Sequence, residues 1–232
     1  LEVLDVPQTV TDLPNALDLV TCNGAISFDR VSFHYTPEIP VLEAVSFSVS
    51  PGEKIAIVGP TGSGKSTTAA LLRRFYDPLS GQVCIDGHDL RTLSQDSIGR
   101  HVSMVLQEPF LFSGTIFENI RYASVTKNLA DVQRAAQVVG AHDFIARLPG
   151  GYQFVLEQGG GNLSLGQRQL ISFARALVAD TRILVLDEAT ANVDSYSERK
   201  IQRALNILLD GRTAIVIAHR LATIRDLSLI HI

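Results

Sequence analysis

The chain has 232 residues, of which 46% are hydrophobic, and this composition supports a buried core and excludes an intrinsically disordered protein. Its 20 Lys and Arg against 24 Asp and Glu give a formal net charge of -4, which argues against a nucleic-acid partner bound through a basic face. The apolar runs are much shorter than the roughly 18 residues that cross a bilayer. Two cysteines, Cys22 and Cys84, are too few for a disulfide framework and favour a reducing compartment.

The N-terminal segment, residues 1–24, is rich in Pro, Thr, Asp and Asn and lacks a sustained hydrophobic period. Such a segment is typical of a linker, so the folded domain is predicted to span residues 25–226. Because the first residue is Leu1 rather than Met, we expect the sequence to begin within a longer protein. The given residues contain no charged-then-apolar leader, so they predict no secretory signal.

The body of the chain alternates between strand and helix patterns. Partial period-two alternation at residues 26–33 and 41–49 predicts antiparallel strands with one solvated face. Continuous apolar runs predict strands covered on both faces, at residues 54–58, 102–106, 183–186 and 213–217. Apolar residues at helical spacing predict helices within residues 129–139, 170–178 and 201–208. The expected fold is therefore α/β, with a mainly parallel core sheet, an antiparallel β-subdomain and an inserted α-helical subdomain over about 117–180.

A glycine-rich motif follows the first buried strand. Residues 59–66 satisfy G-x-x-x-x-G-K-[ST] in full, and a helical pattern opens directly after them. Glycines let backbone N–H groups turn around phosphate oxygens, Lys65 supplies charge to the β and γ phosphates, and Ser66 offers a hydroxyl to Mg²⁺. The sequence therefore predicts a P-loop NTPase in which the phosphates of a nucleotide are held by Gly59, Pro60, Thr61, Gly62, Ser63, Gly64, Lys65, Ser66 and Thr67.

Two carboxylates, Asp187 and Glu188, directly follow the buried strand predicted at residues 183–186. Ligands of open α/β sheets sit at this end of a strand, so Asp187 is predicted to hold Mg²⁺ and Glu188 to act on the attacking water as general base. The alternative is an Asp-Glu pair that only begins a solvated loop. The phosphate motif favours the catalytic interpretation.

The C-terminal tail, residues 227–232, reads L-S-L-I-H-I and matches the translation of a common transposon-derived sequencing adapter. We expect it to be a non-native read-through tail after a domain that ends near Asp226. The alternative is a genuine short strand.

With these motifs placed, residues 26–226 resemble the nucleotide-binding domain of ABC transporters. Residues 163–169 read L-S-L-G-Q-R-Q and resemble the family signature L-S-G-G-Q, with Leu165 where the first signature glycine is usual. The resemblance implies that Ser164 and Gly166, with Gln167 beside them, contact ATP held by the opposite subunit. A capping box formed by Ser164 and Gln167 at a helix start accounts for the same residues locally, and both interpretations can hold.

Four further residues carry over by resemblance. Tyr35 resembles the aromatic residue that stacks on adenine, although a surface tyrosine at a strand end is the alternative. Gln107 resembles the glutamine that senses Mg²⁺ and water at the junction with the membrane domain, and His219 resembles the switch histidine that contacts the γ-phosphate. Asp194 matches the aspartate of the loop that crosses to the partner, or it caps the following helix. The catalytic residues implied in this way are Glu188, His219, Gln107 and Lys65, and the metal-contacting residues are Ser66, Gln107 and Asp187.

The string F-L-F-S-G-T-I-F-E-N-I at residues 110–120 resembles exporter-type domains. The resemblance implies ATP and Mg²⁺ as cofactors, a head-to-tail pair with a second ATPase domain as homo- or heterodimer, and a missing transmembrane domain before the linker. The expected function is ATP hydrolysis that drives export at the cytoplasmic face of the cell membrane. The alternative is a soluble non-transport ATPase of the same family that acts as a switch or scaffold, and the upstream sequence distinguishes the two. A small-molecule P-loop kinase does not account for the signature or for His219.

Overall fold

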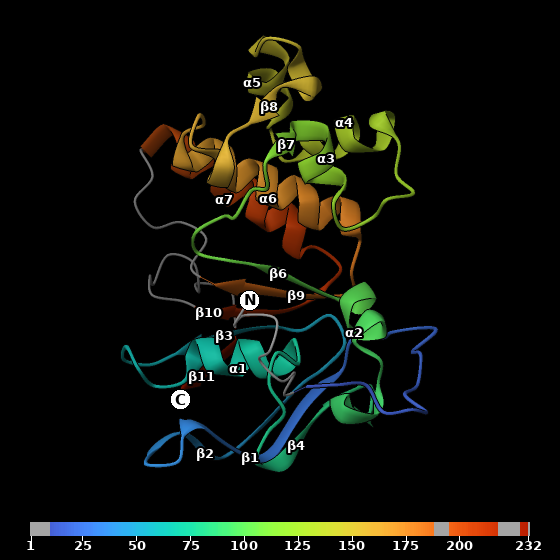
Figure 1. Cartoon of the computed structure of the whole chain (residues 1–232). Coiled ribbons are helices and arrows are strands. Elements are labelled where there is room, and N and C mark those ends of the chain that lie inside the picture. Colours follow the sequence, from blue (N-terminus) through green and yellow to red (C-terminus); the bar gives the residue numbers. More distant parts are fainter. Residues whose placement is uncertain (1–9, 188–194, 218–227, 232) are drawn as a thin grey trace, which may run out of the picture.

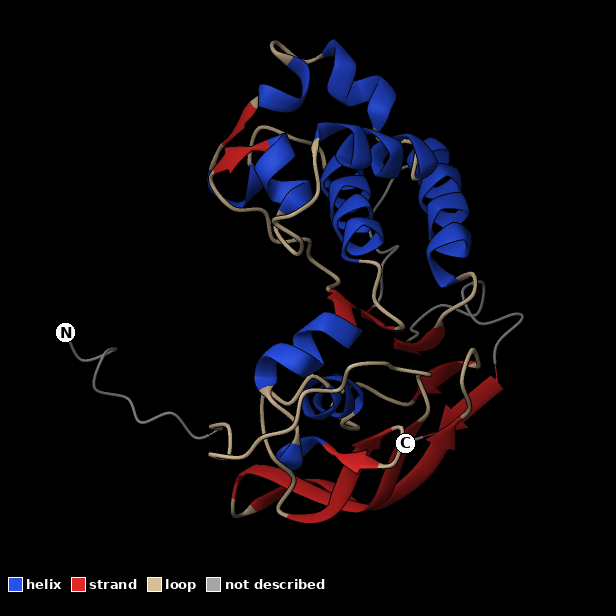
Figure 2. Ribbon diagram, turned by 90° about the vertical axis from the view of Figure 1, so that its right-hand side faces the viewer, coloured by secondary structure: helices blue, strands red, loops and turns tan. Residues whose placement is uncertain are grey.

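The computed structural model describes residues 10–187, 195–217 and 228–231 (Figure 1). Most helices gather at one end of the molecule and most strands at the other (Figure 2). Among the described residues, no helix is long and apolar enough to cross a membrane.

The central layer is a parallel sheet in the order β11-β3-β10-β9-β6. Successive residues of its inner strands belong to two different cores, because Ile55 and Ile57 pack on one face whereas Ala56 packs on the other. Burial on both faces explains why these strands read as continuous apolar runs. The strands are β3 (Lys54–Val58), β6 (Val102–Val105), β9 (Ile183–Asp187), β10 (Thr213–Ile217) and β11 (Ser228–His231).

The tail predicted to be non-native contains β11, which pairs in parallel with β3 at the edge of this sheet. Residues 228–231 therefore adopt the short strand that we gave as the alternative. Whether these residues are native to the gene stays a prediction.

A second, antiparallel sheet has the order β2-β1-β4-β5. Along β1, buried Ile26 and Phe28 alternate with partly exposed residues, which confirms the strands that the period-two pattern predicted. The phase shifts after Phe28, where Arg30 adopts a positive φ of 48° and interrupts the register. The strands are β1 (Ile26–Thr36), β2 (Ile39–Val49), β4 (Ser80–Ile85) and β5 (His88–Asp89).

Helices cover both faces of the parallel sheet (Figure 1). α1 (Lys65–Leu72) and α2 (Gln95–His101) share a core with the antiparallel sheet, whereas α6 (Leu165–Ala179) and α7 (Ser195–Leu209) pack on the opposite face. The remaining helices and a two-stranded sheet lie beyond α6: α3 (Ile116–Arg121), α4 (Leu129–Val138), α5 (His142–Arg147), β7 (Gly114–Thr115) and β8 (Val155–Leu156). The predicted α/β fold, with its parallel core and antiparallel sheet, is confirmed.

Residues 10–24 of the predicted linker lie against the domain. Asp12 accepts hydrogen bonds from the backbone of Gln95, and Leu17 forms a parallel bridge with Leu93. The carboxylate of Asp86 accepts from three successive backbone N–H groups, at residues 23–25. Polar residues that gave this segment its linker-like composition therefore fasten it to the domain.

Candidate active site

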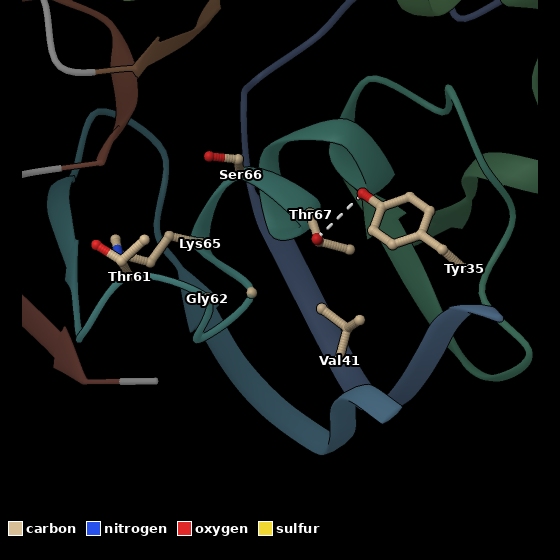
Figure 3. Close-up of a pocket in the computed structure, with 8 residues that line it drawn as sticks. Tyr35, Val41, Thr61, Gly62, Lys65, Ser66 and Thr67 are labelled. Carbon is tan, nitrogen blue, oxygen red and sulfur yellow. Dashed lines mark hydrogen bonds between the residues drawn. The ribbon is translucent and has the colours of Figure 1, made fainter. Parts of the chain in front are cut away.

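The glycine-rich motif forms the loop between β3 and α1. Beside it lies a pocket of about 330 Å³ that opens to solvent (Figure 3). The lining residues come from the end of β1, the start of β2 and this loop: Tyr35, Val41, Thr61, Gly62, Gly64, Lys65, Ser66 and Thr67. The structure therefore brings Tyr35 to the predicted phosphate-binding residues.

Two glycines of the loop adopt positive φ values, 88° at Gly62 and 91° at Gly64. A Cβ atom added to Gly64 would lie 2.5 Å from Cδ2 of Leu42 and 3.0 Å from the carbonyl oxygen of Val41, whereas one added to Gly62 meets open space. The backbone at Gly64 is thus the N-cap of α1 and packs directly against β2. This contact fixes the height of the loop over the antiparallel sheet.

Alanine substitutions separate these two effects. We expect Gly62→Ala to lower the free energy of unfolding by about 1–3 kcal/mol, because only backbone strain is added. Gly64→Ala adds overpacking against Leu42, worth a further ~1–3 kcal/mol, so its total loss is about 2–6 kcal/mol. Urea denaturation of both variants measures the difference. Equal losses would show that the contact with Leu42 and Val41 adds no cost.

Lys65 places a buried cation under the loop. Its side chain is 5% exposed, and its ammonium donates to the carbonyl oxygens of Gly59 at 2.9 Å and Pro60 at 2.8 Å. Among the ion pairs of the described residues, none includes Lys65. The hydroxyl of Ser63 is also buried, and it has no hydrogen-bond partner in the described part of the chain. A positive charge without a carboxylate partner and an unused hydroxyl fit an anion such as a phosphate group.

Ser66 and Asp187 meet at the mouth of this loop. Ser66 Oγ and Asp187 Oδ2 lie 3.5 Å apart, although the residues are 121 positions apart in the chain. Octahedral Mg²⁺ with ligands at about 2.1 Å separates neighbouring ligands by about 3 Å, so the two oxygens fit one direct ligand and one held close by. Within residues 10–187, 195–217 and 228–231, no group of three or more His, Cys, Asp or Glu side chains could hold a metal ion. This donor set suits Mg²⁺, which takes its remaining ligands from water and phosphates.

Tyr35 is 53% exposed at the end of β1. Phe33 and Tyr76 meet its ring edge-on, with centroids 5.0 and 5.3 Å away. Its hydroxyl lies 3.1 Å from Thr67 Oγ1 at the start of α1 (Figure 3). The aromatic ring thus stands beside the phosphate loop, where a base joined to the phosphates could stack on it.

The signature residues lie at the start of α6, outside the lining of this pocket. Ser164 is the exposed N-cap, and it forms a capping box with Gln167, with bonds of 2.9 and 3.3 Å. Gly166 is buried in the first turn, and Leu165 takes the first helical position next to the cap. The capping box expected at this helix start is therefore formed. The exposed helix start is also available to a ligand from another molecule.

Gln107 follows β6 and is exposed. The other three sequence-predicted residues, Glu188, Asp194 and His219, lie outside the described residues. Asp187, which directly precedes Glu188, is the last residue of β9. It pairs with Ile217 at the end of β10, the strand that precedes His219 in the sequence.

A second concavity, of about 420 Å³, was not predicted from the sequence. It lies between the end of β6 and α6, and exposed aromatic side chains on its wall distinguish it from an ordinary surface hollow. We call it the aromatic groove; residues that define it are Phe75, Leu106, Phe110, Phe112, Tyr122 and Arg175. Phe110 and Phe112 belong to the string that resembles exporter-type domains, and this string was the only sequence feature we noted that could have indicated the groove.

The sequence of this chain is similar to a protein-family model and to known proteins. The sequence model described as "ABC transporter" matches residues 42–191. The chain is 52% identical over 225 residues to the uncharacterized ABC transporter ATP-binding protein YknV of Bacillus subtilis, covering 97% of this chain and 37% of that protein. It is 43% identical over 230 residues to the heavy metal tolerance protein of Schizosaccharomyces pombe, covering 99% of this chain and 28% of that protein.

A solved structure is also similar to this chain. A bacterial Atm1-family ABC exporter with ATP bound superposes with a TM-score of 0.92 at 40% identity, over 100% of this chain and 41% of that chain. The chain therefore spans less than half the length of the proteins it matches.

Proposed function

Since this chain belongs to the ABC transporter family, whose ATP-binding domains hydrolyse ATP to power transport, we propose that it is the ATPase domain of an exporter. The rest of that exporter would include the membrane-spanning part. The similarity to the Atm1-family exporter supports the exporter branch. The site would act at the cytoplasmic face of a membrane.

The observation that carries this proposal is the buried ammonium of Lys65. It donates to two carbonyls of its own loop and has no carboxylate in an ion pair with it in the described part of the chain. A triphosphate supplies the missing negative charge, and the ammonium can turn from Gly59 and Pro60 to the β and γ phosphates. The N-terminus of α1 adds its dipole and free N–H groups to the same place.

Each residue of the proposed site would have a separate role in ATP hydrolysis. Lys65 neutralises charge on the transferred phosphoryl group, and Ser66 and Asp187 would hold Mg²⁺, which screens the β and γ oxygens when it is bound. Glu188 would orient the attacking water and accept its proton, with Gln107 and His219 completing the surroundings of the γ-phosphate. Because phosphoryl transfer needs little covalent chemistry from the protein, positioning and charge neutralisation account for most of the catalysis.

We further propose that two ATPase domains pair head to tail. Ser164 and Gly166 do not line the chain's own pocket, yet the exposed N-terminus of α6 is suited to a phosphate. In a head-to-tail pair, each ATP would lie between the phosphate loop of one domain and Ser164, Gly166 and Gln167 of the other. Asp194 would lie in the loop that crosses between them.

The aromatic groove would receive the transmembrane domain. Exposed aromatic side chains gather there beside the segment that follows Gln107, and contiguous exposed apolar surface of this kind marks interaction sites. Occupation of the groove would thereby be coupled to a residue of the ATP site.

Equilibrium binding tests the proposal on the purified chain. We expect ATP and ADP to bind in the presence of Mg²⁺ and AMP to bind much more weakly, because the phosphate loop contacts the outer phosphates. Isothermal titration calorimetry with the three nucleotides measures this order. Equal affinity for AMP and ATP would contradict the assignment of the loop.

Tyr35 provides a test of the adenine contact. Tyr35→Ala should weaken ATP binding by about 5- to 150-fold, the equivalent of the ~1–3 kcal/mol that a base gains by stacking on an aromatic ring. Tyr35→Phe is the matched control, since it removes only the hydroxyl bonded to Thr67 and keeps the ring. Competition by inorganic triphosphate, which has no base, should be equal in all three proteins. An equal loss of affinity in Tyr35→Phe would instead assign the effect to the hydroxyl.

A further inference from the structure

Arg175 lies in the C-terminal half of α6 and lines the aromatic groove. Its guanidinium makes three hydrogen bonds: Nε donates to Asn119 O at 2.8 Å, Nη2 to Asn119 Oδ1 at 3.0 Å, and Nη1 to Phe110 O at 3.0 Å. Its Cζ atom lies 5.8 Å from the ring centroid of Phe112 and 5.9 Å from that of Tyr122. One side chain of α6 therefore contacts the segment 110–122 at four residues.

In the described part of the chain, no carboxylate forms an ion pair with Arg175. Burial lowers the pKa of its guanidinium. Arginine nevertheless stays protonated in proteins, so the described residues hold this cation through carbonyl oxygens and aromatic faces. An apolar residue would fill the same space without the cost of desolvating a charge, so the directed bonds suggest a role beyond packing.

Asn119 extends this contact through the segment. Its side-chain oxygen also accepts from the N–H of Phe112 at 2.9 Å, and its amide nitrogen donates to Phe112 O at 2.9 Å and Thr115 O at 3.1 Å. Asn119 is 2% exposed, so these bonds are shielded from water. Arg175 and Asn119 together, which we call the clamp, fix the path of residues 110–119 against α6.

The clamp stands between two predicted parts of the ATP site. Gln107 lies three residues before Phe110 on the same segment. Ser164 caps the start of α6, about 17 Å from Arg175 at 1.5 Å per helical residue. The phosphate-loop pocket shares no lining residue with the aromatic groove, so the clamp does not touch the proposed ATP-binding surface of its own chain.

We propose that Arg175 is a positioning residue for ATP hydrolysis, which with Asn119 locks the segment after Gln107 to α6 so that both reach the paired ATP site together. This inference rests on the proposed ATPase function. Since Arg175 also lines the aromatic groove, a partner seated there would move Gln107 and the signature end of α6 as one unit.

Arg175→Lys tests the clamp while keeping the charge. Lysine presents its donors from one atom and cannot span the carbonyl of Phe110 and both oxygens of Asn119. We expect kcat for phosphate release to fall by about 10- to 100-fold, the scale for a misplaced catalytic group, while KM for ATP changes by less than about twofold. Hydrogen exchange at the Phe112 amide should also become faster than in wild type. A role in folding alone would lower the melting temperature and leave kcat of the folded protein unchanged.

Arg212→Lys is the matched control. Arg212 is buried and donates to Leu208 O and Asp180 Oδ1, both at 3.1 Å, away from the groove lining. We expect its kcat to match wild type. If Arg175→Lys does not fold, Asn119→Asp keeps the acceptor for Arg175, removes both donated bonds and should show the same loss of kcat at unchanged KM.

The outcomes are decisive in either direction. Unchanged kcat in a folded Arg175→Lys or Asn119→Asp protein, a raised KM at unchanged kcat, or an equal loss in Arg212→Lys would each overturn the clamp. A wild-type chain without ATPase activity would instead reject the proposed function, so the two failures are distinguishable.

Discussion

Lys65→Ala is expected to abolish useful ATP binding. The substitution removes a buried cation that donates to two carbonyls of its own loop and has no carboxylate in an ion pair with it among the described residues. Removing one partner of a buried charged contact costs about 2–5 kcal/mol or more, which corresponds to a rise in Kd of at least about 30-fold. Titration calorimetry with ATP and Mg²⁺ measures the change.

The control for this variant is Lys54→Ala. Lys54 begins β3, the strand before the phosphate loop, at the end opposite that loop, so its removal changes the net charge equally without touching the pocket. We expect its affinity for ATP to match that of wild type. ATP affinity unchanged in Lys65→Ala would remove the lysine from the phosphate site.

Glu188→Gln is expected to keep ATP affinity and lose turnover. A general base acts in the transition state far more than in the bound ground state, and its loss costs about 10²- to 10⁴-fold in rate. Since ATP then stays uncleaved between two subunits, the variant should accumulate as an ATP-bound dimer. A phosphate-release assay and size-exclusion chromatography with and without ATP measure the two effects.

The matched control is Glu43→Gln, at an exposed carboxylate of β2. It should release phosphate at the wild-type rate and form no lasting dimer. Near-normal release by Glu188→Gln would remove this residue from the catalytic role. Lost release by a strictly monomeric Glu188→Gln protein would keep the base assignment and count against pairing.

Local sequence patterns predicted those parts of the fold that local chemistry determines. β3 and β10 have the predicted bounds, because each strand is buried on both faces and its apolar run ends where burial ends. α1 begins at Lys65, two residues before the expected helical pattern, because the loop itself forms the first turn. The phosphate pocket could be foreseen since its motif is contiguous, whereas its contact with Tyr35 came only from the family resemblance.

Contacts between distant segments could not be predicted in the same way. Arg175 and Asn119 are 56 residues apart, and each residue read alone is an ordinary polar position on a helix. The composition and missing periodicity of residues 1–24 predict a linker, but the attachment of residues 10–24 to the domain depends on Asp12 and on Asp86, far along the chain. Side-chain bonds to remote backbone groups leave no period in the sequence.

The most direct test of the account is phosphate release by the wild-type chain over a series of protein concentrations at saturating ATP and Mg²⁺. A site completed by Ser164 and Gly166 of a second molecule predicts that the rate per chain rises with concentration and then levels off as pairs form. Glu188→Gln should remain inactive across the series. A rate per chain that stays constant at every dilution would contradict the shared site, and no release at any concentration would contradict the ATPase itself.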